Sequence, residues 1–257
     1  MEFWYMSGAG NDFMVMDARG KKLDFSQMAL ELCKLANCDG FMAVDVSDKA
    51  DFKLHFYNAD GSRGEMCGNG SRCVSRFAYD HGIAPETMTI ETDAGVITSV
   101  RLSENQYRVR LNNPGVMDLH RKGDIAYVEL GNPGVPHAVV EVADLEHGDR
   151  EKLRAWAKEL RFEPAFPKGA NVNFFRVLEE GQVRILTYER GVEDYTLACG
   201  TGSGSVAAVL FVTGRLPGGK AEIHNPGGTL TLEVAGGAEV TSILMSGPAD
   251  VLKVYEI

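Results

Sequence analysis

The chain has 257 residues, a net charge of −10, 44% hydrophobic residues and 24% charged residues. This composition is typical of a globular protein with one or two domains. The negative charge argues against a protein that binds nucleic acid through its phosphates. No apolar run approaches the ~18 residues of a membrane-spanning helix, and the first residues lack the features of a signal peptide. We therefore expect a cytoplasmic protein with no nucleic-acid or membrane partner.

The five cysteines indicate reduced thiols rather than a cross-linked framework. Their number is odd, and a disulfide framework is unusual in a chain of this length without a secretion signal. No CxxC pair occurs, so the sequence supports neither a zinc site nor a thioredoxin-type motif, and we expect no metal. Cys33, Cys38 and Cys73 occupy apolar helix or strand positions, and we interpret them as core residues. Cys67 and Cys199 stand apart, because each is followed by glycine-rich sequence.

Most segments have the alternating, β-branched or aromatic pattern of strands. In chain order, the expected strands cover 51–57, 87–92, 96–102, 106–111, 125–130, 137–142, 172–178, 182–188, 229–234 and 239–245. Helices are fewer: one over 24–36 with Asp24 as N-cap, and one over 149–160. Two more follow the glycine-rich motifs and end near Gly82 and Gly214.

Three short segments recur in the same order. The stretch "MCGNGSRCV" (66–74) matches "ACGTGSGSV" (198–206), with the two cysteines 132 positions apart, from 67 to 199. Downstream, 90–98 matches 223–231, and upstream, 8–13 resembles 169–174. The repetition predicts two similar halves, each a β-rich wrap around one central helix, with a seam near 112–124.

We place the first half at 1–114 plus 247–257, carrying Cys67, and the second at 115–246, carrying Cys199. The last strand, 249–257, has no partner in the repeat, and we expect it to return to the first half.

A cysteine at a helix start has a specific chemistry. The free N–H groups and the dipole of a helix N-terminus stabilise a thiolate, so we expect a lowered thiol pKa. The same N–H groups bind a carboxylate. Two such units facing one another across a cleft would place the Cα of an amino acid between two sulfurs. One thiolate removes the α-proton and the opposite thiol returns one, which inverts the centre without a cofactor.

Two other interpretations of each motif remain open. A single Cys-Gly-x-Gly is commonly a buried cysteine beside a turn. A phosphate-binding loop is also glycine-rich, but its Gly-x-x-x-x-Gly-Lys-Ser/Thr pattern is absent. The occurrence of two copies in a duplicated frame favours the catalytic interpretation.

The segments "MSGAGNDFMVMD", "FYNADGSRGEMCGNGSRC", "GANVNFFRV" and "YERGVEDYTLACGTGSGS" resemble the diaminopimelate epimerase family in order and spacing over essentially the whole chain. The resemblance implies an α/β (α+β) fold of two similar halves, each a mostly antiparallel, barrel-like sheet around a central helix, with the active site in the cleft between them. It implies a pyridoxal-independent isomerase that interconverts LL- and meso-2,6-diaminopimelate for lysine and peptidoglycan synthesis. It also implies a homodimer and no cofactor.

The resemblance further implies roles for individual residues. Cys67 and Cys199 would be the catalytic acid/base pair, and His137 would lie behind one thiol. The substrate-binding residues would be Gly68, Asn69, Gly200 and Thr201 at the α-carboxylate, Asn11, Asn58, Asn171 and Arg190 at the distal end, and Glu189 at an ammonium group.

The chain departs from the family pattern at two places. Val135 stands where the family commonly has a substrate-binding asparagine, while Asn132 occurs three residues earlier. In "LANCDG" (35–40), only Asp39 and Gly40 remain of a usual glycine-rich segment. A racemase of another amino acid, such as histidine or proline, is the alternative that these departures leave open. A non-catalytic thiol redox sensor or binding protein is a third hypothesis, which the presence of both cysteines disfavours.

Overall fold

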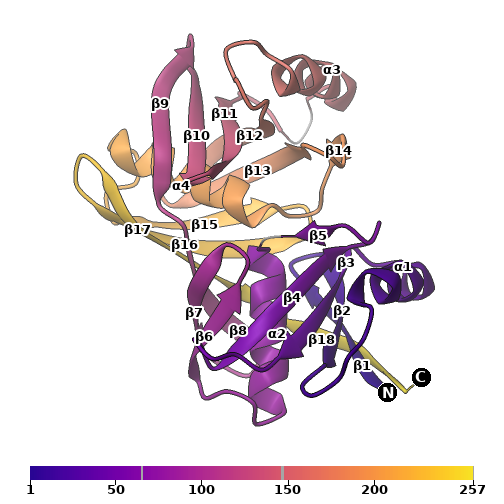
Figure 1. The fold of residues 1–257 in the computed structure, drawn as a ribbon. Coiled ribbons are helices and arrows are strands. Elements are labelled where there is room, and N and C mark those ends of the chain that lie inside the picture. Colours follow the sequence, from indigo (N-terminus) through magenta and orange to yellow (C-terminus); the bar gives the residue numbers. More distant parts are fainter. Residues whose placement is uncertain (65, 146–147, 257) are drawn as a thin grey trace. The chain divides into compact units, whose positions relative to one another are not determined.

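Eighteen strands and four helices make up the part of the chain that the computed structural model describes, residues 1–64, 66–145 and 148–256 (Figure 1). The chain divides into two compact units. Unit 1 consists of Met1–Arg110 and Ser246–Ile257, and unit 2 consists of Leu111–Met245. Segment 112–124, which the sequence suggests as a seam, contains a strand of unit 2.

Unit 1 wraps its strands around one helix. Its elements are β1 (Glu2–Gly8), β2 (Asn11–Asp17), α1 (Phe25–Ala36), β3 (Gly40–Asp45), β4 (Phe52–Asn58), β5 (Arg63–Gly64), α2 (Gly68–Asp80), β6 (Thr87–Thr92), β7 (Gly95–Arg101), β8 (Gln106–Leu111) and β18 (Asp250–Glu256). β2 pairs with β3 and β4 pairs with β6 in parallel, and the other neighbours with a defined register are antiparallel.

Unit 2 has the same design. Its elements are β9 (Pro114–Lys122), β10 (Ile125–Gly131), β11 (Gly134–Glu141), α3 (Arg150–Arg161), β12 (Asn171–Glu179), β13 (Gln182–Glu189), β14 (Asp194–Tyr195), α4 (Gly200–Val212), β15 (Lys220–Asn225), β16 (Gly228–Gly236) and β17 (Val240–Pro248), whose last residues belong to unit 1. β11 pairs with β12 and β13 pairs with β15 in parallel. The fold class that the sequence predicts, two similar α/β halves with few helices, is confirmed.

Strand pairing defines which elements correspond. β1, β2, β3 and β4 of unit 1 have the same order and directions as β10, β11, β12 and β13 of unit 2. The helices α1 and α3 follow β2 and β11, and α2 and α4 follow β5 and β14. The recurrences at the cysteine motifs and at 90–98 and 223–231 fit this correspondence. The match of 8–13 with 169–174 is wrong, because 8–13 leads into β2 whereas 169–174 leads into β12, the counterpart of β3.

The C-terminal strand completes unit 1. β18 pairs with β1 antiparallel, with Glu2 opposite Glu256, as β9 pairs with β10 in unit 2. The prediction that the last strand returns to the first half is confirmed. The expectation that this strand has no counterpart in the other half is wrong, because β9 of unit 2 is its counterpart.

The helices differ in burial according to their sequences. α1 and α3 each begin at an aspartate N-cap, and they bury only part of their surface: Asp24 accepts a hydrogen bond from Gln27, and Asp149 accepts from Glu151 and Lys152. α2 and α4 are buried along most of their length. α4 is apolar on all sides, as expected of a helix enclosed by strands. Gly82 and Gly214 follow their ends with positive φ, as predicted.

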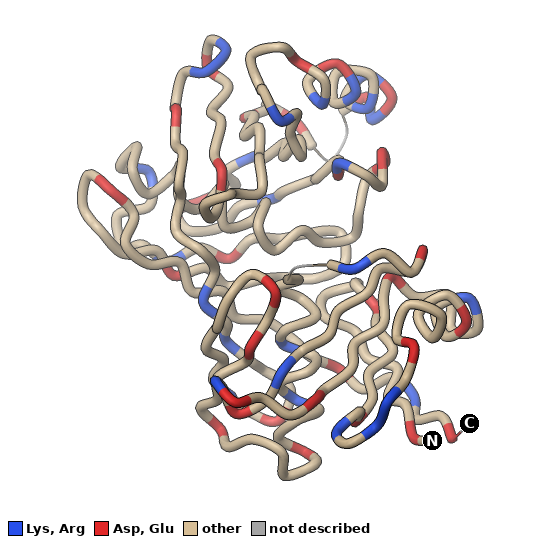
Figure 2. The backbone as a smooth tube through the Cα atoms, in the orientation of Figure 1, with Lys and Arg blue, Asp and Glu red and all other residues tan. Residues whose placement is uncertain are grey.

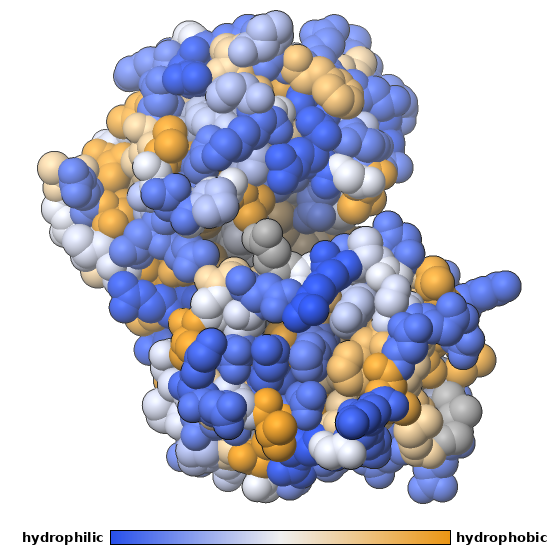
Figure 3. Space-filling model, viewed as in Figure 1, coloured by the Kyte–Doolittle hydropathy of each residue, from blue (hydrophilic) through white to orange (hydrophobic). Residues whose placement is uncertain are grey.

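The surface is charged and mixed. Figure 2 shows acidic and basic residues interspersed along both units, and the face in Figure 3 is mainly hydrophilic with scattered hydrophobic residues. Among the described residues, no helix has the length and apolar character needed to cross a bilayer.

Candidate active site

Both motif cysteines are helix N-caps. Cys67 precedes α2 with extended backbone angles (φ −131°, ψ 118°), and Cys199 precedes α4 with nearly the same angles (φ −120°, ψ 109°). The Sγ of Cys67 accepts a hydrogen bond from the Gly70 N–H at 3.5 Å, and the Sγ of Cys199 accepts from the Gly202 N–H at 3.3 Å. Each sulfur therefore lies among the free N–H groups of a helix start, where an anion is stabilised.

The third residue after each cysteine must be small. A Cβ on Gly70 would lie 1.8 Å from Cε of Met42, and a Cβ on Gly202 would lie 2.2 Å from Oδ1 of Asn173. The glycines thus allow the first helical turn to lie directly on the strand beneath it. Met42 and Asn173 occupy equivalent positions in the two units, on β3 and β12.

In unit 1, two predicted substrate-binding residues are in direct contact at the start of α2. The Asn69 Nδ2 donates to Asn11 Oδ1 at 2.5 Å, and the Asn11 Nδ2 donates to Asp39 Oδ2 at 3.3 Å. Asn58 lies at the end of β4, opposite Gly40, and donates to the Ser62 hydroxyl at 3.0 Å. The structure therefore places Asn11, Asn58 and Asn69 around the strand end at Asp39–Gly40, the segment that departs from the family pattern.

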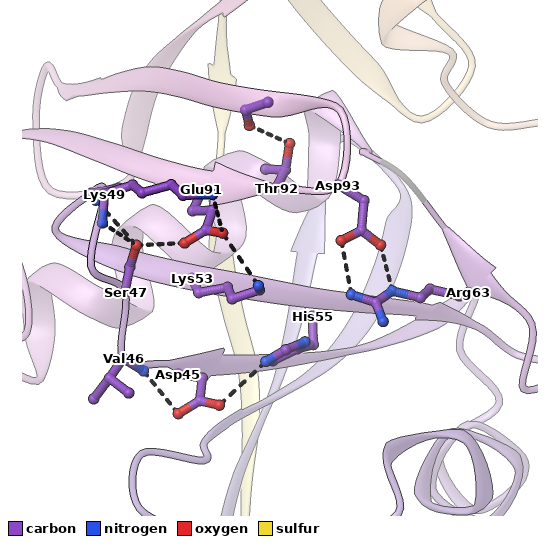
Figure 4. Close-up of polar contacts among 12 residues, drawn as sticks. Asp45, Val46, Ser47, Lys49, Lys53, His55, Arg63, Glu91, Thr92 and Asp93 are labelled. Carbon is purple, nitrogen blue, oxygen red and sulfur yellow. Dashed lines mark hydrogen bonds and ion pairs between the residues drawn. The ribbon is translucent and has the colours of Figure 1, made fainter.

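Ion pairs hold the strands that lead to Cys67 (Figure 4). Arg63 on β5 donates through Nη2 to Asp93 at 2.8 Å, which ties the segment before Cys67 to the β6–β7 turn. On neighbouring strands, the Lys53 ammonium donates to Glu91 at 3.2 Å, and the Ser47 hydroxyl donates to the same carboxylate at 2.6 Å. These contacts fix the strand edge from which the chain enters α2.

Arg72 is a further residue of this site that the sequence analysis does not single out. Its side chain is fully buried in α2, and its Nη1 donates to Asn69 Oδ1 at 3.0 Å. Its Nε donates to the Pro248 carbonyl at 3.1 Å. Burial lowers the pKa of the guanidinium to about 10, while the charges of Cys73 and Cys67 act against this shift. The available signal was an arginine placed among small and apolar residues in the first half of α2, one turn after Gly68.

In unit 2, Glu189 and Thr201 lie against the Cys199 thiol. Cys199 is 6% exposed, and its Sγ lies 3.6 Å from the Thr201 hydroxyl. Burial raises the pKa of Cys199 well above its usual value, and the charge of Glu189, together with a hydrogen bond to its carboxylate, raises it further. The Thr201 hydroxyl and the Gly202 N–H act in the opposite direction.

The expected lowering of this thiol pKa is therefore wrong for Cys199. A helix N-terminus stabilises an anion by about 0.3–1 kcal/mol at an exposed site, whereas burial of a charge shifts a pKa by up to about 3–5 units. Burial and the neighbouring carboxylate outweigh the helix end. The pKa of Cys199 therefore lies above, not below, that of an ordinary thiol.

The remaining predicted residues of unit 2 meet at one corner. The Arg190 N–H donates to Asn171 Oδ1 at 2.8 Å, and its Nη1 donates to the Lys168 carbonyl at 3.1 Å. Asn171 begins β12 directly opposite His137 on β11. His137 is fully buried, and burial followed by the charge of Arg190 lowers its pKa to about 3. His137 is therefore neutral and does not serve as a proton donor or acceptor near neutral pH.

The other motif predictions have simple structural outcomes. Cys33, Cys38 and Cys73 are buried, which confirms their interpretation as core residues. Val135 lies in β11 and is 38% exposed, whereas Asn132 lies in the turn before that strand. Within 1–64, 66–145 and 148–256, no three His, Cys, Asp or Glu side chains gather as a metal site requires.

Comparison with known proteins extends the match over both units. The family described as diaminopimelate epimerase matches residues 3–115 and 130–252. The diaminopimelate epimerase of Aquifex aeolicus is 37% identical over all of this chain and 96% of that protein. That of Archaeoglobus fulgidus is 34% identical over 97% of this chain and 94% of that protein.

Solved structures share the fold at lower identity. A Bacillus anthracis phenazine biosynthesis protein of the PhzF family has a TM-score of 0.75 at 15% identity, covering 100% of this chain and 98% of that one. A hydroxyproline epimerase from Agrobacterium vitis has a TM-score of 0.70 at 18% identity, covering 100% and 90%. These two likenesses concern the fold alone. With the family match over both halves and the relatives above 30% identity, the chain belongs to the diaminopimelate epimerase family.

Proposed function

We propose that the protein is a cofactor-independent two-thiol epimerase that interconverts LL- and meso-2,6-diaminopimelate, a precursor of lysine and peptidoglycan. The observation that carries the proposal is the matched pair of cysteine N-caps, each with its sulfur on the N–H group three residues later. Membership of the family supports the same activity.

The helix starts suit the reacting carboxylate. The N–H groups of Gly68 and Asn69 at α2, and of Gly200 and Thr201 at α4, belong to the first turn of each helix, at its positive end. A carboxylate bound at such a helix start gains hydrogen bonds and the favourable end of a helix dipole. The same contacts stabilise the charge that develops next to Cα when its proton leaves.

The proton transfers require both thiols. One sulfur, as the thiolate, takes the α-proton, and the electron pair of the broken Cα–H bond remains on Cα beside the bound carboxylate. The other sulfur, as the thiol, gives its proton to the opposite face and becomes the thiolate. The raised pKa of Cys199 suits it to the proton-donating role in the resting enzyme.

The distal half of the substrate has matching groups. Arg190 carries a planar cation that pairs with a second carboxylate in two parallel hydrogen bonds. Asn11, Asn58 and Asn171 provide amide donors and acceptors, and Glu189 provides a charge for an ammonium group. Contacts among Asn11, Asn69 and Asp39 in unit 1, and between Asn171 and Arg190 in unit 2, support these roles. The homodimer and the cytoplasmic location stay predictions.

Solvent exchange tests the two-thiol mechanism. Cys67→Ala and Cys199→Ala are each expected to abolish inversion, because each removes the proton donor or acceptor on one face. Deuterium uptake at Cα from heavy water and the LL/meso ratio are measured with LL-diaminopimelate. Cys33→Ala, a buried thiol outside the site, is the control and should retain activity. Inversion at the wild-type rate in either active-site variant would refute the mechanism.

A substrate panel separates the alternative activities. Diaminopimelate, histidine, proline and glutamate are compared for Cα exchange. We expect turnover of diaminopimelate, since Arg190 and the asparagines suit a polar side chain with its own carboxylate. Turnover of proline or histidine alone would reject both the substrate and the role of Arg190.

A further inference from the structure

The two units differ in the side chain beneath the glycine of each cysteine motif, Met42 or Asn173, and in its neighbours on the two adjacent strands. The strand register makes three pairs of positions equivalent, one each on β2 and β11, β3 and β12, and β4 and β13. They hold Phe13, Met42 and Phe56 in unit 1, and His137, Asn173 and Thr187 in unit 2. Unit 1 therefore folds with an apolar cluster at these positions. The polar cluster of unit 2 is not required by this fold.

Four hydrogen-bond partners determine the orientation of the Asn173 amide. Its Nδ2 donates to the carbonyl of Ala138 at 3.1 Å and to the carbonyl of Asn171 at 3.3 Å. The Thr187 hydroxyl donates to its Oδ1 at 3.0 Å. The carbonyls accept only, so the nitrogen must face them. The fourth neighbour, His137, therefore faces a nitrogen whose identity is settled by the other three.

The orientation of Asn173 determines the tautomer of His137. The Asn173 Nδ2 lies 3.1 Å from His137 Nδ1, and because an amide nitrogen does not accept hydrogen bonds, a proton on Nδ1 would have no acceptor there. A neutral imidazole carries one N–H, so the proton is on Nε2. Burial and the Arg190 charge keep the ring neutral. The Nε2 is buried and has no hydrogen-bond partner within the described residues.

We propose that Asn173, oriented by the carbonyls of Ala138 and Asn171, is a positioning residue that locks His137 as its Nε2–H tautomer and thereby supplies a fixed hydrogen-bond donor to an anion in the reaction. A buried N–H without an acceptor costs free energy in the resting protein. The apolar side chains at the equivalent positions of unit 1 show that the fold can form without this cost. The acceptor is a substrate carboxylate or a thiolate. Only this last point rests on the proposed function.

The wild-type protein provides the first test. Nitrogen NMR of ¹⁵N-histidine-labelled protein distinguishes a protonated from an unprotonated ring nitrogen. We expect His137 to show a protonated Nε2 and an unprotonated Nδ1 across neutral pH. A protonated Nδ1 in the wild-type protein would overturn the proposal, whatever the enzyme's substrate.

Substitutions at Asn173 test the lock. Asn173→Asp replaces the donor by an acceptor, so we expect Nδ1 of His137 to become protonated. Asn173→Met copies Met42 of unit 1 and is expected to fold and to lose the fixed tautomer. Thr187→Val is the control: the two carbonyls still orient the amide, and the tautomer should stay. An unchanged tautomer in both Asn173 variants would overturn the proposal.

Two further measurements address the acceptor. Addition of diaminopimelate to the wild-type protein should shift the Nε2–H resonance if the acceptor is a carboxylate, and a rise in pH without ligand should shift it if the acceptor is a thiolate. No shift in either arm would reject the donor role. In kinetics, Asn173→Met should lower kcat roughly tenfold to a hundredfold, as expected for one charge-assisted hydrogen bond, with a smaller change in KM.

Discussion

At the scale of single residues, the Cys199 thiol lies under two opposing influences. Burial and Glu189 favour the protonated form, while Thr201 and the helix N–H groups favour the thiolate. Desolvation decides the balance, because its effect on the thiol pKa exceeds that of a helix dipole. Glu189 thus raises the pKa of the Cys199 thiol as well as being a candidate ligand for an ammonium group.

Glu189→Gln is expected to lower the pKa of Cys199, because it removes a negative charge and the carboxylate that accepts the thiol proton. Below the pKa, a fall of one pKa unit increases the thiolate fraction roughly tenfold. The alkylation rate of Cys199 by iodoacetamide near neutral pH, followed by peptide mass spectrometry, should rise accordingly.

Glu222→Gln on β15 makes the same chemical change in unit 2 at a carboxylate that does not act on Cys199, and it should leave the rate unchanged. A slower or equal alkylation rate in Glu189→Gln would contradict the assignment of Glu189 as a group that raises this pKa.

At the scale of elements, α2 and α4 begin and end in the same way, but their first turns pack against different side chains. Each begins at a cysteine N-cap and is followed by a glycine with positive φ. Beneath Gly70 lies the flexible end of Met42, whereas beneath Gly202 lies an amide held by four hydrogen-bond partners. The two helices therefore differ in how much their first turn can shift.

Alanine at the two glycines should have unequal effects. Gly202→Ala is expected to destabilise the protein by about 1–3 kcal/mol, the usual cost of overpacking, since Asn173 has no room to move. Gly70→Ala should cost less, because Met42 can rotate and alanine favours a helix by ~1 kcal/mol over glycine. Calorimetric melting temperatures measure both.

Gly218→Ala serves as the reference, because a Cβ there meets no atom within 4 Å. Its melting temperature should stay close to that of the wild type. A larger loss in Gly70→Ala than in Gly202→Ala would contradict the difference in rigidity between the two supporting strands.

At the scale of the whole molecule, the two ends of the chain lie in unit 1 where unit 2 has a hairpin connection. In unit 2, β9 continues into β10 through Gly123 and Asp124. In unit 1, the equivalent strands β18 and β1 are the last and first of the chain, with Glu256 opposite Glu2 (Figure 1). Joining the ends would give unit 1 the connectivity that unit 2 already has.

A circular permutant should therefore fold. We expect a chain in which Ile257 is joined to Met1, with new ends between Gly237 and Ala238 in the turn after β16, to retain the circular dichroism spectrum and the epimerase activity. The matched control has the same join but opens β12 between Phe174 and Phe175, both buried, and should not fold. Equal failure of both permutants would reject the equivalence of β18 and β9.

Much of the fold was predictable from local patterns. The strands predicted from 51 onward correspond to observed strands, and the helices at 24–36 and 149–160 begin at their predicted aspartate caps. The strands that were not predicted are β1, β2, β3, β5, β9, β14 and β15. β3 is buried on nearly every residue, so it lacks the alternation that marks a strand with one exposed face.

The sequence by itself determined the duplication, the two cysteine helix starts and the family, because glycine spacing, caps and periodicity are local properties of the chain. Only the tertiary structure decided the pairing of β18 with β1, the burial of Arg72 and the hydrogen bonds that give His137 its tautomer. It also reversed the expected pKa shift of Cys199. These features depend on residues distant in sequence, such as Pro248 for Arg72 and Asn173 for His137, and on desolvation, which is a property of the packed interior.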